Sequence, residues 1–494
     1  MTNASLTLAC LLVSSAPAQD VWVDPVLGDD ASAGTQAEPL RTISAALART
    51  DVTARLLPGE YSAASGETFP LLLEGFDSIR AEGDAETTRI VLPDAGGSLS
   101  YGSLQIAAEA TIQGVTLEQE GTSTNAITIV NSPYSVYNHL VLQDSRVLGG
   151  ATGVAGNANG RITIQGCEIA GQSGAAITTF RCSLALSDVT IRDATSGIQA
   201  ASLGAPVHLE RVSILDVAET AIYLYNWQYA YALEASIHDC LLAGHERGIH
   251  SDQGFVWNEV DVRGCTIVSD RGQGVVRDDS GGFIHVVDSI VAGHTLGDLQ
   301  GVARFENSLA EYGALPAHRP GSLVGDPMFV DRAGGDFRLG WGSPCIDSAQ
   351  PGFSRDLTGQ PRVVDGNLDL APAPDMGALE HRTLTGPESI RLGETVALEL
   401  TGPLGGFSTV VISPAGYAAV GATTPYGRFF LKPGGSFRLP SVLTQGIAPT
   451  QLTTPPFTDP SLVGTRVGLQ ALTRSTDAPA GGAYSQPLLV RIDP

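Results

Sequence analysis

One short phrase recurs along this chain and limits what it can fold into. IQGCEIAG at 164 is similar to IHDCLLAG at 237 and VRGCTIVS at 262. Its core, aliphatic–x–polar or Gly–small–x–aliphatic, occurs nine times between 112 and 310, at intervals of 19 to 30 residues. A second row of small–aliphatic pairs, from Ala126-Ile127 to Gly274-Val275, follows the same drifting period out of phase. Two rows that share a period indicate a repeated supersecondary unit.

Each phrase predicts a short strand that ends in a turn. Apolar and polar residues alternate, Ile, Val and Thr are frequent, and helical spacing is absent between the phrases. Units of this size that contain only strands and turns bury their apolar faces by stacking coil on coil, as in a parallel β-helix. A leucine-rich repeat would need a regular Leu/Asn framework, and a sandwich would not keep two rows in register. We expect a rod about 40 Å long whose coils rise by about 4.8 Å each.

The fourth position of the phrase predicts an inward column of small side chains. The column reads Val115, Ser145, Cys167, Val189, Val212, Cys240, Cys265, Ser289 and Ser308. Its cysteines are therefore expected to be buried free thiols that behave as small apolar residues. A disulfide between Cys240 and Cys265 on adjacent coils is the alternative, because an oxidising compartment would permit it.

Charge and the first residues bear on partners and location. The formal net charge is −24 and Lys432 is the single lysine, which disfavours nucleic acid and anionic membrane surfaces. Residues 1–18 hold an apolar run followed by Ala16-Pro17-Ala18, the small–x–small pattern of a signal-peptidase site, so cleavage after Ala18 is expected. No later segment is apolar enough for long enough to insert into a membrane. We expect a secreted, extracellular or cell-surface monomer.

Residues 21–92 contain the stretches VWVDPVLGDDASAGTQAEPLRTISAALA at 21 and LLPGEYSAASGETFPLLL at 56. On these stretches, the segment resembles the DUF1565 region of pectin-lyase-like proteins. The resemblance implies an all-β chain built on a right-handed parallel β-helix. Residues 19–110 would form the N-terminal cap and first coils, and 111–320 the remaining coils. A helix from about Leu40 to Arg49 is expected to cover the open N-terminal end of the stack.

Two further segments follow the coils. The first segment contains DPMFVDRAGGDFRLGWGSPCIDSA at 326 and RDLTGQPRVVDGNLDLAPAPDMGALEH at 355. It is similar to the choice-of-anchor Q region of exported β-helix proteins. This resemblance implies a C-terminal cap over 321–384. Its many carboxylates invite a metal or catalytic interpretation, but Asx turns and a buried arginine pair explain them better. From 385 to 494 alternating stretches such as STVVISP predict an antiparallel β-sandwich, which resembles the C-terminal module of many bacterial exported proteins.

Aromatic residues gather on the coils between 220 and 280, although they make up only 6% of the chain. The candidate substrate-binding residues there are Tyr223, Tyr225, Trp227, His250 and Asp252. Exposed rings stack on sugars and carboxylates bind hydroxyl groups, so we expect a polysaccharide or surface glycan as partner. The alternative is that the longer coil at 209–237 folds a loop back and buries its own aromatics.

Arg277, Asp278 and Asp279 are the candidate catalytic residues. In a pectate-type lyase Arg277 would be the base, because the single lysine lies far away, and calcium held by Asp252, Asp278 or Asp279 would neutralise a uronate. A glycoside hydrolase would instead use Asp278 or Asp279 with another carboxylate as acid and base. The competing class is a non-catalytic adhesion or scaffold protein with the β-helix as a rigid spacer.

Two further electrostatic expectations concern calcium and the substrate. Asp29 and Asp30, in GDDASAG, are candidates for a structural Ca²⁺ site, with a plain Asx-turn loop as the alternative. A polyanionic substrate fits a chain of charge −24 only where calcium or a local arginine cluster reverses the field.

Overall fold

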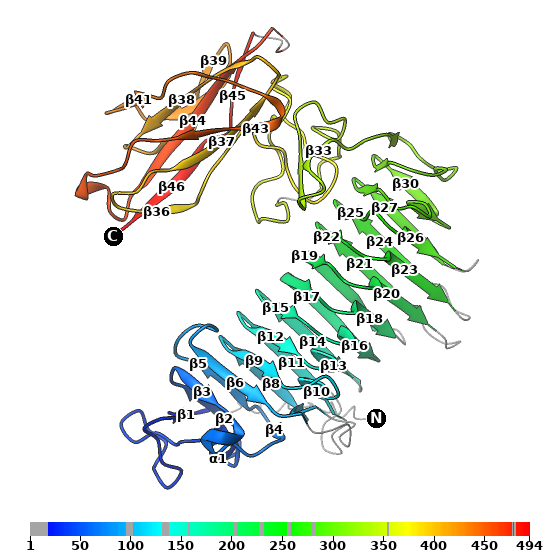
Figure 1. Cartoon of the computed structure of the whole chain (residues 1–494), viewed down its shortest axis with the longest axis vertical. Coiled ribbons are helices and arrows are strands. Elements are labelled where there is room, and N and C mark those ends of the chain that lie inside the picture. Colours follow the sequence, from blue (N-terminus) through cyan, green and yellow to red (C-terminus); the bar gives the residue numbers. More distant parts are fainter. Residues whose placement is uncertain are drawn as a thin grey trace, which may run out of the picture.

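The computed structural model describes residues 18–94, 102–130, 138–156, 159–201, 205–226, 232–253, 258–278, 282–352, 355–476, 478 and 481–494. These residues form a parallel β-helix, a flanking region and a C-terminal β-sandwich with antiparallel sheets (Figure 1). The predicted fold class is confirmed. Within the described ranges, no helix has the length and hydropathy needed to cross a bilayer. The predicted signal peptide lies outside these ranges except for Ala18.

Ten parallel strands form one sheet of the β-helix. In spatial order along the rod they are β4 (Leu71–Leu73), β7 (Leu104–Ile106), β10 (Ile127–Ile129), β13 (Val154–Gly156), β16 (Ala175–Phe180), β18 (Ser196–Ala201), β20 (Thr220–Asn226), β23 (Arg247–Gln253), β26 (Gln273–Arg277) and β29 (Leu299–Gln300). Their register places the second predicted row in one fully buried column: Ile127, Val154, Ile177, Ile198, Ile222, Ile249 and Val275. The second row was therefore correctly predicted as a core column.

The remaining strands of the coils form a 22-stranded sheet that bends along its length. One row consists of β1 (Gln19–Val23), β2 (Val52–Leu56), β5 (Ser78–Ala81), β8 (Glu109–Gln113), β11 (Asn138–Gln143), β14 (Gly160–Gln165), β17 (Cys182–Arg192), β19 (Val207–Leu215), β21 (Glu234–His238), β24 (Glu259–Arg263), β27 (Phe283–Val287) and β30 (Arg304–Glu306). The other consists of β3 (Gly59–Tyr61), β6 (Thr88–Leu92), β9 (Thr116–Gln119), β12 (Arg146–Gly149), β15 (Glu168–Ala170), β22 (Leu241–Ala243), β25 (Thr266–Val268), β28 (Ile290–Ala292), β31 (Leu309–Ala310) and β32 (Leu323–Val324). The long strands β17 and β19 pair with both rows and join them.

The recurring phrase builds the bend between these two rows. Its third residue has a positive φ, between 44° and 73°, in all nine copies: Gly114, Asp144, Gly166, Asp188, Arg211, Asp239, Gly264, Asp288 and Asn307. Gly, Asp and Asn tolerate this left-handed conformation better than other residues, which explains why eight of the nine copies carry one of them. Arg211 is the exception, and it pairs with Asp188 on the preceding coil at 2.7 Å.

The fourth residue of each phrase points into the core. All nine members of the predicted column are at most 4% exposed, which confirms it as an inward column. The five described cysteines are free and buried. Cys240 and Cys265 do not form a disulfide. The Cys240 thiol donates to the carbonyl of His238 (3.1 Å), and the Cys265 thiol donates to the carbonyl of Ile237 (3.2 Å). The cysteines therefore act as small core residues rather than as cross-links.

The N-terminal end of the stack is covered by α1 (Ile43–Leu47), which is shorter than the predicted helix. Thr42 is its N-cap, and Asp30 accepts hydrogen bonds from the backbone N–H groups of Arg41 and Thr42, both at 2.9 Å. Ile43 and Ala46 are buried against the first coil. The short 3₁₀ helix η1 (Ala63–Ser65) follows β3.

The flanking region, residues 325–383, differs from the predicted cap in its placement. It covers the outer flank of the last coils, where Phe329, Leu339 and Met376 pack against Ile290 and Ala292. β33 (Phe329–Asp331) and β34 (Asp336–Leu339) form its antiparallel hairpin. Leu315, in the loop before this region, packs against the end of the core instead.

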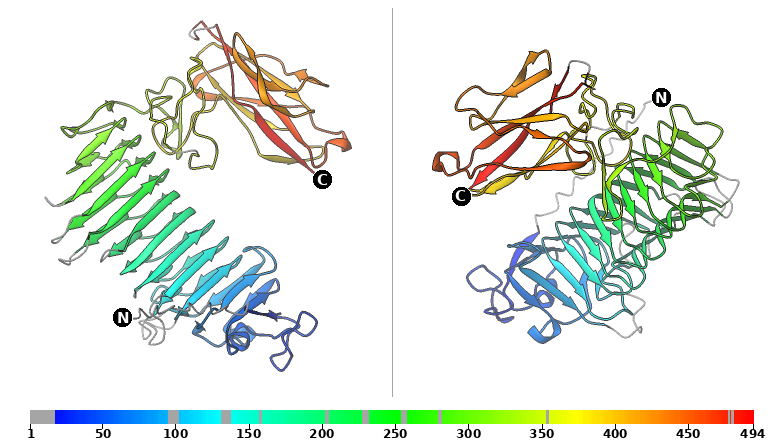
Figure 2. Two further views of the ribbon diagram at one scale, coloured as in Figure 1. Left: turned by 180° about the vertical axis from the view of Figure 1, so that it is seen from behind. Right: turned by 45° about the horizontal axis from the view of Figure 1, so that its top comes forward.

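The β-sandwich lies to one side of the β-helix and does not continue its axis, as both views in Figure 2 show. One sheet contains β35 (Leu384–Thr385), β37 (Ala397–Gly402) and β43 (Gly446–Thr453). The other contains β36 (Ser389–Arg391), β38 (Phe407–Ser413), β41 (Phe437–Arg438), β42 (Val442–Leu443), β44 (Arg466–Arg474), β45 (Ala483–Tyr484) and β46 (Leu488–Asp493). β39 (Tyr417–Thr424) pairs with β40 (Gly427–Leu431), and η2 (Pro460–Leu462) precedes β44. A separate apolar core, including Val410, Leu469 and Val490, joins the two main sheets.

Candidate functional site

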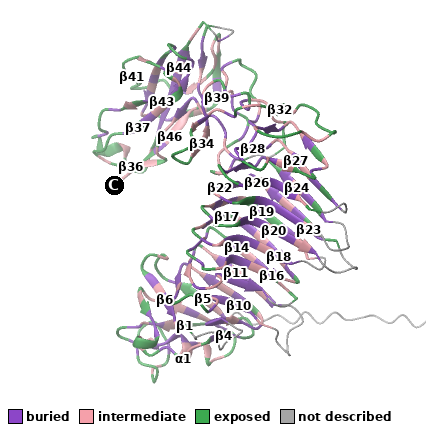
Figure 3. Cartoon of the chain, turned by 45° about the vertical axis from the view of Figure 1, so that its right-hand side comes forward, coloured by how far each residue is buried: buried purple, intermediate pink, exposed green. Residues whose placement is uncertain are grey.

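Tyr223, Tyr225 and His250 lie on the outer face of the ten-stranded sheet, on the neighbouring strands β20 and β23 (Figure 3). Tyr223 is in register with His250, and their ring centroids are 4.9 Å apart. The Tyr225 ring, two residues further along β20, stacks on Tyr223 with ring centroids 5.1 Å apart. Both tyrosines are half-buried, whereas Leu224 between them points inward and is fully buried. We call Tyr223, Tyr225 and His250 the aromatic platform.

Two carboxylates fix the polar ends of the platform. The Tyr223 hydroxyl donates to Asp252 Oδ2 at 3.0 Å. Burial, and then this carboxylate, raise the pKa of Tyr223 to about 12, so the hydroxyl keeps its proton at neutral pH. His250 Nε2 lies 2.7 Å from Asp278 Oδ2; the imidazole is 9% exposed and the carboxylate 49%. The rings are thus held in place while Asp278 still faces solvent.

Arg277 does not join the platform. Its Cα is in register with Ser251 on β23, which is in register with Leu224 on β20, and both of those residues are fully buried. The Arg277 guanidinium donates to the carbonyl of Gly282, and its buried Nε has no hydrogen-bond partner among the residues that the structure describes. The structure therefore brings Asp278, and not Arg277, onto the outer face.

Two predicted site residues, Trp227 and Asp279, lie outside the described residues. The catalytic assignment of Arg277, Asp278 and Asp279 stays a prediction. The predicted binding residues Tyr223, Tyr225, His250 and Asp252 do lie together.

Phe180 is a platform neighbour that the sequence analysis missed. It is in register with Ala201 on β18, which is in register with Tyr225 on β20. The Arg181 guanidinium lies 5.2 Å from the centre of its ring. Phe180 lies two residues after the outward Thr178, so the alternation of side chains along a strand could have identified it from the sequence.

The predicted calcium ligands have structural contacts in the N-terminal loop. Asp29 accepts the N–H of Ala31 at 3.0 Å, as in an Asx turn, and Asp30 accepts the Thr42 hydroxyl at 3.0 Å as well as the two N–H groups at the start of α1. The Ca²⁺ site at these residues stays a prediction.

The carboxylates of the flanking region also serve as turn acceptors. Asp347 accepts N–H groups from Gly366 and Asn367, and its pKa is raised to about 6 by burial. Ligand atoms of Asp347, Asp365 and Asp369 approach within 4.8 Å of one another. The predicted buried arginine pair is present, because Arg362 binds Asp239 at 2.6 Å and Glu380 at 2.8 Å.

Residues 26–206 match a family described as a protein of unknown function, DUF1565. The match makes this part of the chain similar to DUF1565 regions. It extends through the coils to β18, well beyond residue 92, where the resemblance seen in the sequence ended.

Several solved structures are similar to this chain at low sequence identity. A pectate lyase, Pel9A, is 12% identical, with a TM-score of 0.47 over 74% of this chain and 98% of that one. XylC in complex with xylose is 9% identical, with a TM-score of 0.37 over 78% and 90% of the two chains. A GH136 lacto-N-biosidase from Eubacterium ramulus is 11% identical, with a TM-score of 0.36 over 62% and 67%. No curated protein matches the chain.

Proposed function

We propose that this chain is an exported β-helix protein that binds a polysaccharide or surface glycan on the aromatic platform. The observation that carries the proposal is the stacking of Tyr223 with both Tyr225 and His250 on the outer face of the ten-stranded sheet. Export rests on the pattern of residues 1–18, and it predicts a secreted protein whose first residue is Gln19.

The platform offers the two kinds of contact that a sugar ring needs. Aromatic faces stack on the apolar face of a pyranose, and the neighbouring carboxylates accept hydrogen bonds from its hydroxyl groups. Asp252 and Asp278 stand beside the rings and keep acceptor capacity beyond the single hydrogen bond that each makes with the platform. Phe180 extends the apolar surface along the rod by two coils.

The geometry favours binding over a lyase reaction. A base must reach the proton that it removes, within hydrogen-bond distance. Arg277 occupies the inward register position, and its guanidinium bonds the Gly282 carbonyl. A hydrolase that uses Asp278 with Asp252 is the second candidate, because both carboxylates stand on the same outer face.

Glycan binding is tested by screening the secreted protein against a polysaccharide panel. We expect Tyr223→Ala and Tyr225→Ala each to weaken binding by roughly twofold to tenfold, since a ring contact contributes about 0.5–1.5 kcal/mol beyond its buried area. Tyr417→Ala is the matched control, because Tyr417 is 42% exposed and lies on the sandwich. Equal losses in all three variants would contradict the proposal.

The same screen separates binding from catalysis. Reducing ends and the ultraviolet absorbance of unsaturated products are followed with and without calcium. Turnover that is lost in Asp278→Asn while binding is retained would make the protein a hydrolase and move us to the second candidate.

A further inference from the structure

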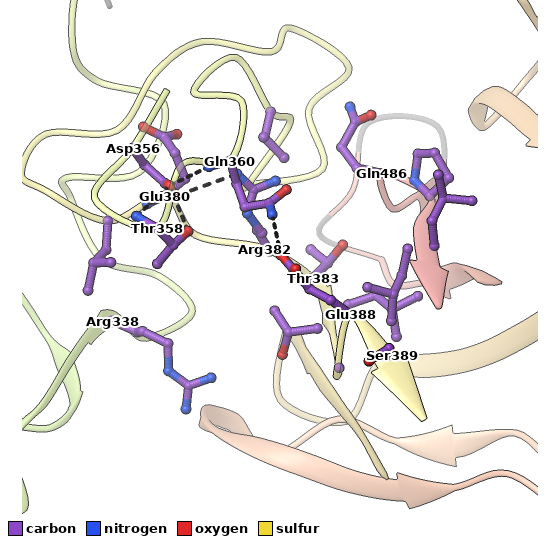
Figure 4. Close-up of a pocket in the computed structure, with 18 of the residues that line it drawn as sticks. Arg338, Asp356, Thr358, Gln360, Glu380, Arg382, Thr383, Glu388, Ser389 and Gln486 are labelled. Atoms are coloured by element: carbon purple, nitrogen blue, oxygen red, sulfur yellow. Dashed lines mark hydrogen bonds and ion pairs between the residues drawn. The ribbon is translucent and has the colours of Figure 1, made fainter. Parts of the chain in front are cut away.

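A cleft of about 630 Å³ separates the flanking region from the β-sandwich (Figure 4). One wall comes from the segments around Asp356 and Glu380, and the other from β36, β44 and β46. The volume lies within the range of small-ligand sites, which occur preferentially between domains. None of its lining residues belongs to the aromatic platform, so the cleft is a separate surface.

Two arginines lie next to each other in the sandwich wall. Arg466 on β44 is in register with Arg491 on β46, and Arg491 is in register with Ser389 on β36. All three residues line the cleft. Like charges directly opposite on neighbouring strands destabilise a sheet, so this pair costs stability in the absence of an anion.

The guanidiniums of this pair retain free hydrogen-bond donors. Arg491 binds Asp493 through Nε (2.7 Å) and one terminal nitrogen (3.2 Å), which leaves the other terminal nitrogen. Arg466 is exposed, and no other described residue supplies a hydrogen-bond or ion-pair partner for its side chain. An incoming anion therefore meets available donors from both residues.

The opposite wall adds two arginines that are already paired with carboxylates: Arg338 with Asp336 (2.6 Å) and Glu399, and Arg382 with Asp356 (3.5 Å). Arg338 and Arg382 reach the cleft from the flanking region, as Figure 4 shows. Of the acidic lining residues, Asp356 is buried and accepts the N–H groups of Thr358 and Gln360, and Glu380 is buried against Arg362 outside the cleft. Glu388 is the remaining lining carboxylate and is exposed.

We propose that this cleft binds the carboxylate-bearing end of an acidic saccharide, with Arg466 and Arg491 holding the carboxylate. A planar guanidinium matches a carboxylate with two parallel hydrogen bonds. Neutral hydrogen-bonding side chains surround the opening and suit sugar hydroxyl groups: Gln360, Ser389 and Gln486. In a chain of charge −24, such a local cluster of arginines is what a polyanion needs in order to approach.

The inference goes beyond the aromatic platform and can be tested without it. Full-length mature chain is titrated calorimetrically with digalacturonate, with its methyl ester and with inorganic sulfate. We expect digalacturonate to bind, more weakly as salt is raised, and the ester and sulfate to bind at least tenfold more weakly.

The variants isolate the two arginines. Arg466→Ala and Arg491→Ala are each expected to weaken digalacturonate binding by about tenfold or more, and Arg466→Lys to recover part of it. Arg438→Ala, which changes an exposed arginine on β41, is the matched control and is not expected to change the affinity. Unchanged thermal unfolding of each variant shows that the fold is intact.

Three results would overturn the proposal. Sulfate that binds as tightly as digalacturonate would show a simple anion site without saccharide recognition. Binding that survives both arginine variants would place the ligand elsewhere, and the absence of digalacturonate binding to the intact protein would remove the site. None of these results bears on glycan binding by Tyr223 and Tyr225.

Discussion

Replacing Arg362 with methionine should release the flanking region from the β-helix. The Arg362 side chain is 3% exposed and donates six hydrogen bonds. They end on the carboxylates of Asp239 and Glu380 and on three backbone carbonyls. Asp239 and Gly264 belong to the bend of the coils, so this one side chain links two coils to the flanking region.

The expected cost follows from the burial of the two carboxylates. Asp239 is 3% and Glu380 0% exposed, so Arg362→Met leaves two buried carboxylates without their partner. Breaking a buried pair in this way costs about 3–5 kcal/mol. The loss should be smaller in acid, because burial raises the pKa of both carboxyl groups and protonation removes their charge.

Hydrogen exchange measures this cost locally. The N–H of Gly377 bonds the Asp288 carbonyl, and the N–H of Ala378 bonds the Thr266 hydroxyl, so both amides report docking of the flanking region. Their protection should fall by roughly two to four orders of magnitude in Arg362→Met, while the amides of the ten-stranded sheet keep theirs. Arg89→Met, which removes a 42% exposed arginine from a surface pair, should cost less than about 1 kcal/mol.

A triple variant tests the reasoning itself. Arg362→Met combined with Asp239→Asn and Glu380→Gln removes the unpaired charges, so it should recover much of the lost protection. Protection in the triple variant no higher than in Arg362→Met would refute the electrostatic argument, and unchanged protection in Arg362→Met would refute the role of the residue.

Three further predictions concern pH, thiols and the bend. Burial lowers the pKa of His381 to about 4, so the unfolded chain takes up a proton first as pH falls below about 6.5, and stability falls by up to about 3 kcal/mol by pH 4. His381→Phe removes this titration together with the hydrogen bond between Nδ1 and the Leu339 carbonyl, so the difference in urea midpoint between wild type and variant should change over that window and stay constant above about pH 7.5. The five described cysteines should not react with a thiol reagent until the protein is denatured, and reaction of a native thiol would contradict their burial. Gly166→Ala places a Cβ 2.8 Å from Asp144 Oδ1 at a φ of 63°, and it should lower the free energy of unfolding by about 1–2 kcal/mol. Gly171→Ala is the comparison, with a φ of 78° but no atom closer than 3.8 Å to the new Cβ, and it should lower the free energy of unfolding by less in the same denaturation assay.

The β-helix could be predicted from sequence because its coils impose one requirement repeatedly. The small residue at position four and the apolar residue two positions later are needed in every copy, so the pattern survives the drift in coil length. The sequence also shows Gly, Asp or Asn at the third position of most copies. The left-handed conformation of that residue could be assigned only after the structure showed the bend. Arg211, stabilised by Asp188 on the preceding coil, shows that a contact between coils can override that preference.

The residue type at the fifth position of the phrase indicates which coils are covered by residues 325–383. The fifth position of the phrase is charged in the second and third copies, at Arg146 and Glu168, and apolar in three of the last four, at Leu241, Ile290 and Leu309. The first pair forms a surface ion pair at 2.8 Å, whereas Leu241 and Ile290 are buried under the flanking region. An apolar residue at an outward position indicates a cover, but not which segment supplies it.

Arg277 shows that residues close together in the sequence need not lie in the same site. Successive residues of a strand face opposite sides, so Arg277 and Asp278 cannot both lie in one groove while the strand stays regular. Grouping them by closeness in sequence ignored this alternation. The arginine cleft could not be predicted at all, because its two walls meet only after the sandwich docks on the flanking region.

The platform depends on the local lengthening of two strands. In the first four strands of the ten-stranded sheet each strand has three residues, which leaves one outward position per coil, such as Thr128 or Ala155. β16 and β18 have six residues and β20 and β23 have seven, and this added length creates the second outward position that Phe180, Tyr225 and Asp252 occupy. The stacked coils hold the two positions in register, so the rings and their carboxylates are preorganised without a dedicated domain. In such a solenoid, irregular coil length is therefore the feature that creates a binding surface on an otherwise repetitive rod.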